Sequence, residues 1–331
     1  MTRRVLWGVL FGVVVYAGIV LWSDAGALLD ALSSLSWWAF PAALGCSLVN
    51  YALRFLKWQI YLRVLEVKIA TFPSLLINLS AYSMGVTPGK VGEVLKSFLL
   101  KRVTGTSVTK SAPIVLAERV TDLLGCLVLI GAGGLVSHPE FAWVFWTTLG
   151  LCAALVAFLA SERLSGLGLS VAGKLPLLNR VVERVETLLV SSRRLLAPKQ
   201  LVAPTILSTL GWGAECIGFW ILANGILPNG ELSLSFATFA YATGSVVGAL
   251  AIFLPGGLGA TEYAMGTLFR REAQAVAEVS LETARALSVG ATLLVRLATL
   301  WFGVVVGLFA LAWFQKVYGA VEFETLDADE R

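Results

Sequence analysis

Uncharged apolar stretches long enough to cross a lipid bilayer constrain the fold of this chain more than any other feature. The stretch 141–160, for example, contains no Asp, Glu, Lys or Arg, and an α-helix needs about 20 such residues to cross about 30 Å of hydrocarbon. Of the 331 residues, 57% are hydrophobic and only 14% are charged, which leaves too little polar surface for a water-soluble globule. The sequence therefore predicts an all-α polytopic membrane protein.

We expect about six to eight membrane-spanning helices from apolar segments of this length. The clearest segments are 5–22, 37–53, 112–136, 141–160, 201–227, 235–254 and 288–313. The first of them also resembles the apolar core of a signal peptide, because Ala25-Gly26-Ala27 is similar to a cleavage site. Its length and the preceding Arg3 and Arg4 favour an uncleaved helix that begins on the cytoplasmic side.

Proline and glycine interrupt two of the apolar segments. The residues 85–93 break the segment 72–101, and the residues 254–262 break the segment 235–269. Proline removes a backbone donor and glycine permits turns, so both helices should break at membrane depth. A broken backbone is tolerated there only where protein or a water-filled cavity satisfies it. The sequence therefore predicts two Pro-Gly re-entrant helical hairpins.

The positions of Lys and Arg indicate which side of the membrane each connection occupies, since these residues stay on the cytoplasmic side. Basic residues at 54–68, among them Lys57, precede the first break, and others at 101–110 follow it, so this hairpin should open to the cytoplasm. The second hairpin follows an external connection at 229–231 and should open outward. Hairpins that enter from opposite faces predict an inverted repeat, as in transporters that bind substrate near the membrane midplane.

The predicted repeat divides the chain into a first half at residues 37–160 and a second half at residues 201–314. The connection 161–200 alternates Arg and Lys with Leu and Val in a helical pattern, which predicts an amphipathic helix on the cytoplasmic surface. A polar tail follows at 321–331. We expect both termini on the cytoplasmic side of the cytoplasmic membrane of a prokaryote.

Ionisable residues near the two breaks are candidates for a functional site, because each is costly in lipid unless it faces a cavity or a partner. They are Lys90, Glu93, Lys96, Glu118, Arg119 and Asp122 in the first half, and Glu215, Glu262 and Arg296 in the second. Polar residues that could line the same cleft, or bond between helices instead, are Asn50, Asn78, Tyr82, Thr87, Tyr241 and Thr243.

One interpretation of these charges is an anion site. Lys90, Arg119 and Arg296 would bind an anionic headgroup such as phosphate, assisted by the half-helix N-termini after Pro88 and Pro255. Three acidic residues, Glu93, Asp122 and Glu262, would balance the charge or titrate.

The alternative interpretation is static packing. In that case Arg119 pairs with Asp122, Arg296 pairs with Glu262, and both pairs only fix the positions of helices.

Three motifs resemble a known family. They are Thr-Pro-Gly-Lys-Val-Gly-Glu at 87–93, Ala-Glu-Arg-Val-Thr-Asp at 117–122, and Phe-Leu-Pro-Gly-Gly-Leu-Gly at 253–259 followed by Glu262. In this order they are similar to the flippase-like transmembrane domain of bacterial lysylphosphatidylglycerol synthase. The resemblance implies one flippase-like domain over 1–320 that moves an anionic or aminoacylated phospholipid, or a lipid-linked headgroup, between leaflets.

The resemblance and the charge pattern together define a predicted headgroup cleft. Its residues are Thr87, Pro88, Gly89, Lys90, Glu93, Lys96, Glu118, Arg119, Asp122, Pro255, Gly256, Gly257, Gly259, Glu262 and Arg296. Only a short polar tail follows Trp313, so the aminoacyl-transferring domain of the synthase has no counterpart and we expect no enzymatic activity.

Soluble-enzyme motifs fail on inspection. The glycines around 85–91 are one residue too close for a phosphate-binding P-loop, and no Ser or Thr follows Lys90. His138 is the only histidine, which disfavours a histidine-rich metal site. We expect a membrane lipid substrate and no cofactor, metal or nucleic acid. Enzymes of cell-envelope synthesis are candidate partners. Two rival functions remain: an accessory or scaffold subunit of that synthesis, and a membrane glycosyltransferase that acts on a polyprenyl carrier.

Overall fold

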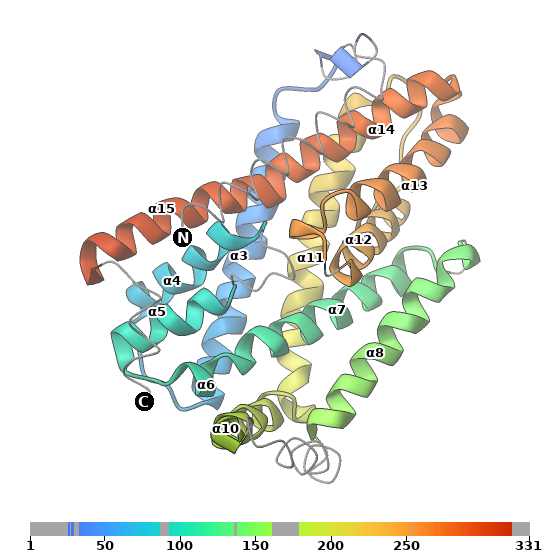
Figure 1. The fold of residues 1–331 in the computed structure, drawn as a ribbon. Coiled ribbons are helices and arrows are strands. Elements are labelled where there is room, and N and C mark those ends of the chain that lie inside the picture. Colours follow the sequence, from blue (N-terminus) through green and yellow to red (C-terminus); the bar gives the residue numbers. More distant parts are fainter. Residues whose placement is uncertain are drawn as a thin grey trace.

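The computed structural model describes Gly26, Leu28, Leu29 and residues 33–86, 93–135, 138–160, 179–251 and 253–319. Within these residues the protein is helical and contains no strand. The α-helices are α3 (Ala39–Val64), α4 (Thr71–Ser80), α5 (Leu95–Thr104), α6 (Val108–Ser111), α7 (Pro113–Gly133), α8 (Ala142–Ala160), α10 (Asn179–Leu195), α11 (Pro198–Ile226), α12 (Leu234–Leu250), α13 (Ala260–Ala277), α14 (Leu281–Arg296) and α15 (Phe302–Tyr318) (Figure 1). Short 3₁₀ turns are η1 (Ala81–Met84), η3 (Pro139–Phe141) and η4 (Pro255–Gly257), and η5 (Leu297–Trp301) is a π-helical turn.

Four of the described helical segments are long and apolar enough to cross a membrane. They are Ala39–Val64, Pro139–Phe158, Pro198–Ile226 and Leu281–Tyr318. They overlap the predicted spans 37–53, 141–160, 201–227 and 288–313, although the first helix continues to Val64 and the last extends from Leu281 to Tyr318. The segment 112–136 folds as α7, which carries three charged residues, and 235–254 contains the shorter apolar helix α12. The predicted first span at 5–22 and the tail at 321–331 lie outside the described residues.

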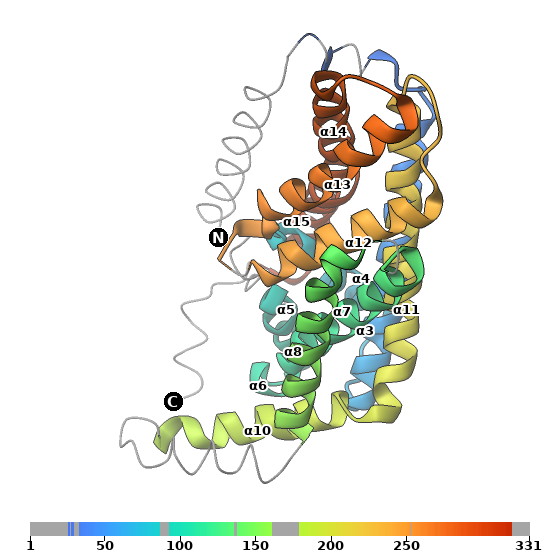
Figure 2. The same cartoon turned by 90° about the vertical axis from the view of Figure 1, so that its right-hand side faces the viewer.

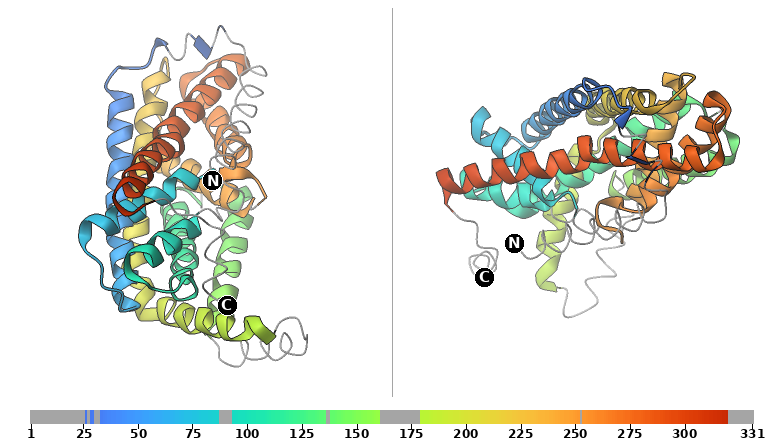
Figure 3. Two further views of the ribbon diagram at one scale, coloured as in Figure 1. Left: turned by 60° about the vertical axis from the view of Figure 1, so that its left-hand side comes forward. Right: turned by 90° about the horizontal axis from the view of Figure 1, so that it is seen from above.

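Helices α3 and α11 lie side by side along much of their length (Figures 1 and 3). Small residues allow this close approach: a Cβ placed on Gly218 would lie 3.6 Å from the Cα of Ala43, and one on Gly211 would lie 2.7 Å from the side-chain oxygen of Asn50. Tight contact through glycine is common between membrane helices, where dispersion rather than water exclusion drives packing. The contact brings the polar residues in the middle of both helices together.

Helices α14 and α15 join through η5 into one rod of 38 residues, about 57 Å long at 1.5 Å per residue. Figure 1 shows the rod crossing α3 and α11 diagonally. Gly303 and Gly307 lie one turn apart on it, and a Cβ on Gly307 would collide with the backbone of Tyr82 and Ser83. The rod formed by α14 and α15 therefore packs directly against η1, the last turn before the first break.

The second break lies between α12 and α13, which pack against each other. A Cβ on Gly248 of α12 would collide with the hydroxyl of Thr261. Within the break, Gly256, Gly257 and Gly259 have φ values of 60°, 69° and 89°, a conformation that glycine adopts without the strain of a side chain. The sequence at 254–262 thus interrupts the helix as predicted, through glycine as much as through Pro255.

Two hydrophobic clusters occupy opposite ends of the helices. The first includes Ala43 of α3, Ile130 of α7 and Phe219 of α11. The second includes Trp58 of α3 and Ile114 of α7. The polar residues in the middle of these helices therefore lie between two apolar cores. The described part of the connection 161–200 includes α10, which lies across one end of the molecule (Figure 2).

Candidate functional site

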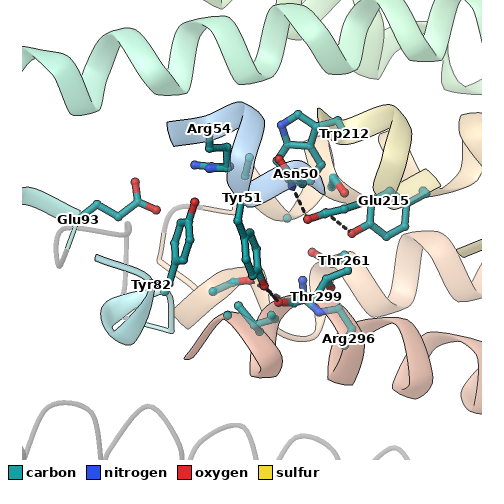
Figure 4. Close-up of a pocket in the computed structure, with 18 residues that line it drawn as sticks. Asn50, Tyr51, Arg54, Tyr82, Glu93, Trp212, Glu215, Thr261, Arg296 and Thr299 are labelled. Carbon is teal, nitrogen blue, oxygen red and sulfur yellow. Dashed lines mark hydrogen bonds between the residues drawn. The ribbon is translucent and has the colours of Figure 1, made fainter. Parts of the chain in front are cut away.

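A central cavity of about 120 Å³ lies where the middle of α3 and α11 faces the two breaks. Residues from both halves of the chain line it, and Figure 4 shows them pointing inward. The charged and strongly polar ones are Asn50, Tyr51, Arg54, Tyr82, Glu93, Trp212, Glu215, Tyr241, Thr261, Arg296 and Thr299. The cavity exceeds several-fold the roughly 10–15 Å³ that one water needs.

Glu215 marks one side of the central cavity. Its carboxylate accepts a hydrogen bond from the amide of Asn50 and another from the hydroxyl of Tyr241 at 2.7 Å. The side chain is buried, so these donors offset part of the cost of removing a carboxylate from water. Beside it, the buried indole N–H of Trp212 has no hydrogen-bond partner among the described residues.

Arg54 marks the opposite side of the central cavity, near Tyr82 and Glu93 (Figure 4). One guanidinium nitrogen lies 3.3 Å from Asp122, and the guanidinium carbon lies 5.9 Å from the ring centre of Tyr82. A second nitrogen, Nε, is buried without a hydrogen-bond partner in the described part of the chain. A guanidinium with spare donors beside a cavity is suited to bind an oxyanion.

Lys57 belongs to the basic cluster that precedes the first break, and the structure buries its side chain. The ammonium is fully buried, 2.5 Å from Asp122 Oδ1 and 2.8 Å from the hydroxyl of Ser208. The reason is position: Lys57 lies one turn beyond Arg54 on the inward face of α3, so it faces α7 and α11. Asp122 thus contacts two cations.

The predicted static pair of Arg119 with Asp122 is also wrong. Arg119 pairs with Glu93, the last residue of the first break, whereas Asp122 pairs with Arg54 and Lys57. Arg119 and Asp122 share one face of α7, but that face contacts two different segments. Asp122 meets α3, whereas Arg119 meets the end of the first break. Lys96 and Glu118 form a further buried pair at 2.9 Å.

The second predicted pair, Arg296 with Glu262, is confirmed. Arg296 Nε donates to Glu262 at 2.7 Å, and another of its nitrogens donates to the carbonyl of Gly256 at 2.9 Å. The other carboxylate oxygen of Glu262 accepts from the backbone N–H of Gly259 at 2.6 Å. Arg296 and Glu262 therefore fix the shape of the second break from both sides, and Arg296 also lines the cavity.

Described residues of the two breaks meet at the central cavity, although residues 94–253 separate the breaks along the chain. A Cβ on Gly256 would lie 3.3 Å from the carbonyl oxygen of Gly85 and 3.5 Å from the Cα of Val86. The close approach and the φ of 60° both favour glycine at this position. The interrupted backbone of both halves thus converges where the charged residues lie.

The residues of the predicted cleft fall into four groups in the structure. Glu93, Gly256 and Arg296 line the cavity, and Arg119, Asp122 and Glu262 pair with residues that line it. Lys96 and Glu118 instead form their buried pair next to Trp58, with the Lys96 ammonium 5.1 Å from that ring centre. Pro255, Gly257 and Gly259 shape the second break. Thr87, Pro88, Gly89 and Lys90 lie outside the described residues.

Arg54 and Lys57 are the charged residues that the sequence prediction missed as site residues. Both were assigned to the flank of the first break because they follow an apolar segment. A signal was present: Asn50, Arg54 and Lys57 are spaced four and three residues apart, which places them on one helix face. Trp212 carried no comparable signal, since tryptophan is common at membrane interfaces.

Fold and site together define the class: a multi-pass helical membrane protein in which charged side chains surround a cavity midway along apolar helices. The chain belongs to the lysylphosphatidylglycerol synthase TM region family, which matches residues 9–307. It is 25% identical to a UPF0104 membrane protein of Methanothermobacter thermautotrophicus, over 92% of this chain and 94% of that protein. It is 26% identical to a UPF0104 membrane protein of Methanocaldococcus jannaschii, over 54% of this chain and 75% of that protein. The family expected from the three motifs is confirmed.

Proposed function

We propose that this protein moves a membrane lipid between leaflets, with the headgroup passing through the central cavity while the acyl chains stay in the bilayer. The observation that carries the proposal is the cavity itself, where Arg54 and Arg296 from different halves face a shared space between the two breaks. Charged residues at such depth are costly, and membrane proteins use them mainly along substrate pathways.

The charge distribution supports a headgroup that contains phosphate. Two cations, Arg54 and Arg296, and two acids, Glu93 and Glu215, line the cavity. Each arginine has an acidic partner at or next to the cavity, in Asp122 and Glu262. An entering phosphate would therefore replace these carboxylates as the partner of the arginines, because arginine binds phosphate in a bidentate geometry. We assign an anionic or aminoacylated phospholipid, or a lipid-linked headgroup, as cargo and no catalytic step.

The order of elements supports an inverted repeat built around two re-entrant hairpins. Each half has a long helix, a Pro-Gly break and an acidic residue after it, and then an arginine on a following helix that pairs with that residue. The pairs are Glu93 with Arg119 and Glu262 with Arg296. In transporters, such repeats place the binding site between the halves. We propose the same organisation in a cytoplasmic membrane, with both termini on the cytoplasmic side and cell-envelope enzymes supplying the lipid.

The test is inversion of a fluorescent phosphatidylglycerol in liposomes that contain the purified protein. We expect faster inversion than in empty vesicles, and a loss of about tenfold in Arg54→Gln, since a hydrogen bond to a charged group contributes about 1.5–3 kcal/mol. Arg271→Gln is the matched control, because Arg271 is exposed on α13 and does not pair with a buried charge. Inversion no faster than in empty vesicles for anionic, zwitterionic and polyprenyl lipids would reject the proposal and favour a scaffold role.

A further inference from the structure

A second hollow, here called the lateral groove, lies beside the central cavity between α7, α8, α11 and α12. Its volume is about 300 Å³ and its lining is mainly apolar, including Leu123 and Cys126 of α7 and Leu155 of α8. Leu151, also in the lining, is 53% exposed on α8. The groove therefore reaches the outer surface of the helices, where a membrane protein contacts lipid. Figure 2 shows α8 on this side of the molecule, in front of α7.

The lateral groove and the central cavity share a wall. Trp212, Ser245 and Ala249 line both. The buried indole N–H of Trp212, which has no hydrogen-bond partner in the described structure, thus lies at the boundary between an apolar and a charged space. An amphiphilic ligand that spans the boundary would place polar atoms next to this donor.

Two ion pairs cross the same boundary. Arg54 lines the cavity and its partner Asp122 lines the groove, while Glu93 lines the cavity and its partner Arg119 lines the groove. An anion that competes for Arg54 or Arg119 would weaken these links between the two spaces. The negative charge of a phosphate would therefore weaken the ion pairs that hold the central cavity and the lateral groove apart.

We propose that the lateral groove binds an acyl chain of an anionic glycerophospholipid whose phosphate enters the central cavity between Arg54 and Trp212. This inference rests on the proposed function for its cargo and adds the route: the lipid enters sideways between α8 and α12. The acyl chain then fills the apolar groove, while the phosphate of the same molecule accepts hydrogen bonds from the indole N–H and the arginine. Neither space alone fits both parts of a lipid.

The experiment uses the full chain in phosphatidylcholine vesicles with a trace of phosphatidylglycerol whose acyl chain carries a photoreactive diazirine. After illumination, labelled residues are mapped by peptide mass spectrometry. We expect labelling at Leu123 and Leu155 that excess unlabelled phosphatidylglycerol abolishes and that excess zwitterionic phosphatidylethanolamine or inorganic phosphate leaves unchanged. Labelling on outward faces, such as that of Val128, 53% exposed on α7, should not respond to competitor.

Variants separate groove binding from general lipid contact. Ala249→Trp fills the shared wall and Leu155→Trp fills the groove from α8, so both should lose the competed labelling. Val128→Trp adds the same ring to the outward face of α7 and should retain it. Thermal unfolding in detergent checks that each variant is folded, and Leu155→Trp alone suffices if Ala249→Trp does not fold.

The outcomes distinguish this inference from the proposed function, because lipid inversion is measured on the same vesicles. Competed groove labelling without inversion would support the groove and reject transport. Inversion with labelling spread evenly over exposed helix faces would support transport and overturn the groove. Competition by phosphatidylethanolamine as strong as that by phosphatidylglycerol would overturn the requirement for an anionic headgroup.

Discussion

At the scale of single residues, a few buried charged side chains make the interior of this protein polar. Asp122 contacts both Lys57 and Arg54, so removal of one cation leaves a carboxylate and an arginine to adjust within a low-dielectric interior. Breaking a buried pair costs more than the pair itself contributes, because the remaining charge loses its partner but stays out of water. The loss of stability on replacing one of these residues therefore tests whether its charge is buried.

Lys57→Met should destabilise the protein by about 3 kcal/mol, since it removes one partner from a fully buried pair. Combining it with Asp122→Asn should recover more than about 1 kcal/mol of the sum of the single effects, because the two residues are coupled. Thermal unfolding in detergent measures both, with the exposed Arg271→Gln as control. A Lys57→Met variant as stable as the parent would contradict the buried position of the ammonium.

Glu215 offers a second test at this scale. Glu215→Ala leaves the amide of Asn50 and the hydroxyl of Tyr241 without their acceptor, which should cost about 2 kcal/mol or more. Glu215→Gln keeps an acceptor oxygen and should cost less than half as much. Unfolding midpoints of the two variants, compared side by side, check the prediction. Equal losses would mean that the charge rather than the hydrogen bonds stabilises this part of the protein.

At the scale of elements, glycine determines how closely the broken segments approach the long helices. Gly307 contacts η1 and Gly248 contacts the start of α13, and in both cases a Cβ would collide with neighbouring atoms. Gly150 of α8, in contrast, is not constrained, because a Cβ there meets nothing within 4 Å. Position, and not composition, decides which glycines matter.

Gly307→Ala should therefore destabilise the protein by about 2 kcal/mol, because overpacking of a tight contact costs about 1–3 kcal/mol. Gly150→Ala makes the same chemical change in open space and should change stability by less than about 0.5 kcal/mol. Unfolding curves of both variants in the same detergent provide the comparison. Equal effects would show that η1 does not dock against the rod of α14 and α15.

At the scale of the whole molecule, the contact between the two breaks is the place where the halves would have to separate for a headgroup to pass. The contact joins Gly256 to Gly85 and Val86. A permanent link across it should therefore stop transport without disturbing either hydrophobic cluster.

The variant Val86→Cys with Gly256→Cys tests this, in a background where Cys46, Cys126, Cys152 and Cys216 are replaced by alanine. A Cβ at Gly256 lies 3.5 Å from the Cα of Val86. One Cα–Cβ bond longer, the two Cα atoms lie at most about 5 Å apart, and disulfide-linked Cα atoms are usually about 4.4–6.8 Å apart. Oxidation should abolish lipid inversion and reduction should restore it, while each single-cysteine variant should be insensitive to oxidant. Undiminished inversion by the oxidised protein would exclude separation of the breaks as a step.

The sequence by itself determined the helical membrane class, the positions of four long apolar helices and the interruption at 254–262. These depend on local properties, namely the length of apolar runs and the backbone chemistry of proline and glycine. It also predicted the pair of Glu262 with Arg296, which the structure confirms.

Only the tertiary structure decided which charges meet. Arg119 pairs with Glu93 instead of Asp122, Lys57 is buried, and Trp212 lies between two hollows. Each of these facts depends on how far neighbouring helices rotate and how closely their glycines let them approach. Periodicity places a residue on a face of its own helix, but the partner that the face meets is set by packing across the whole molecule.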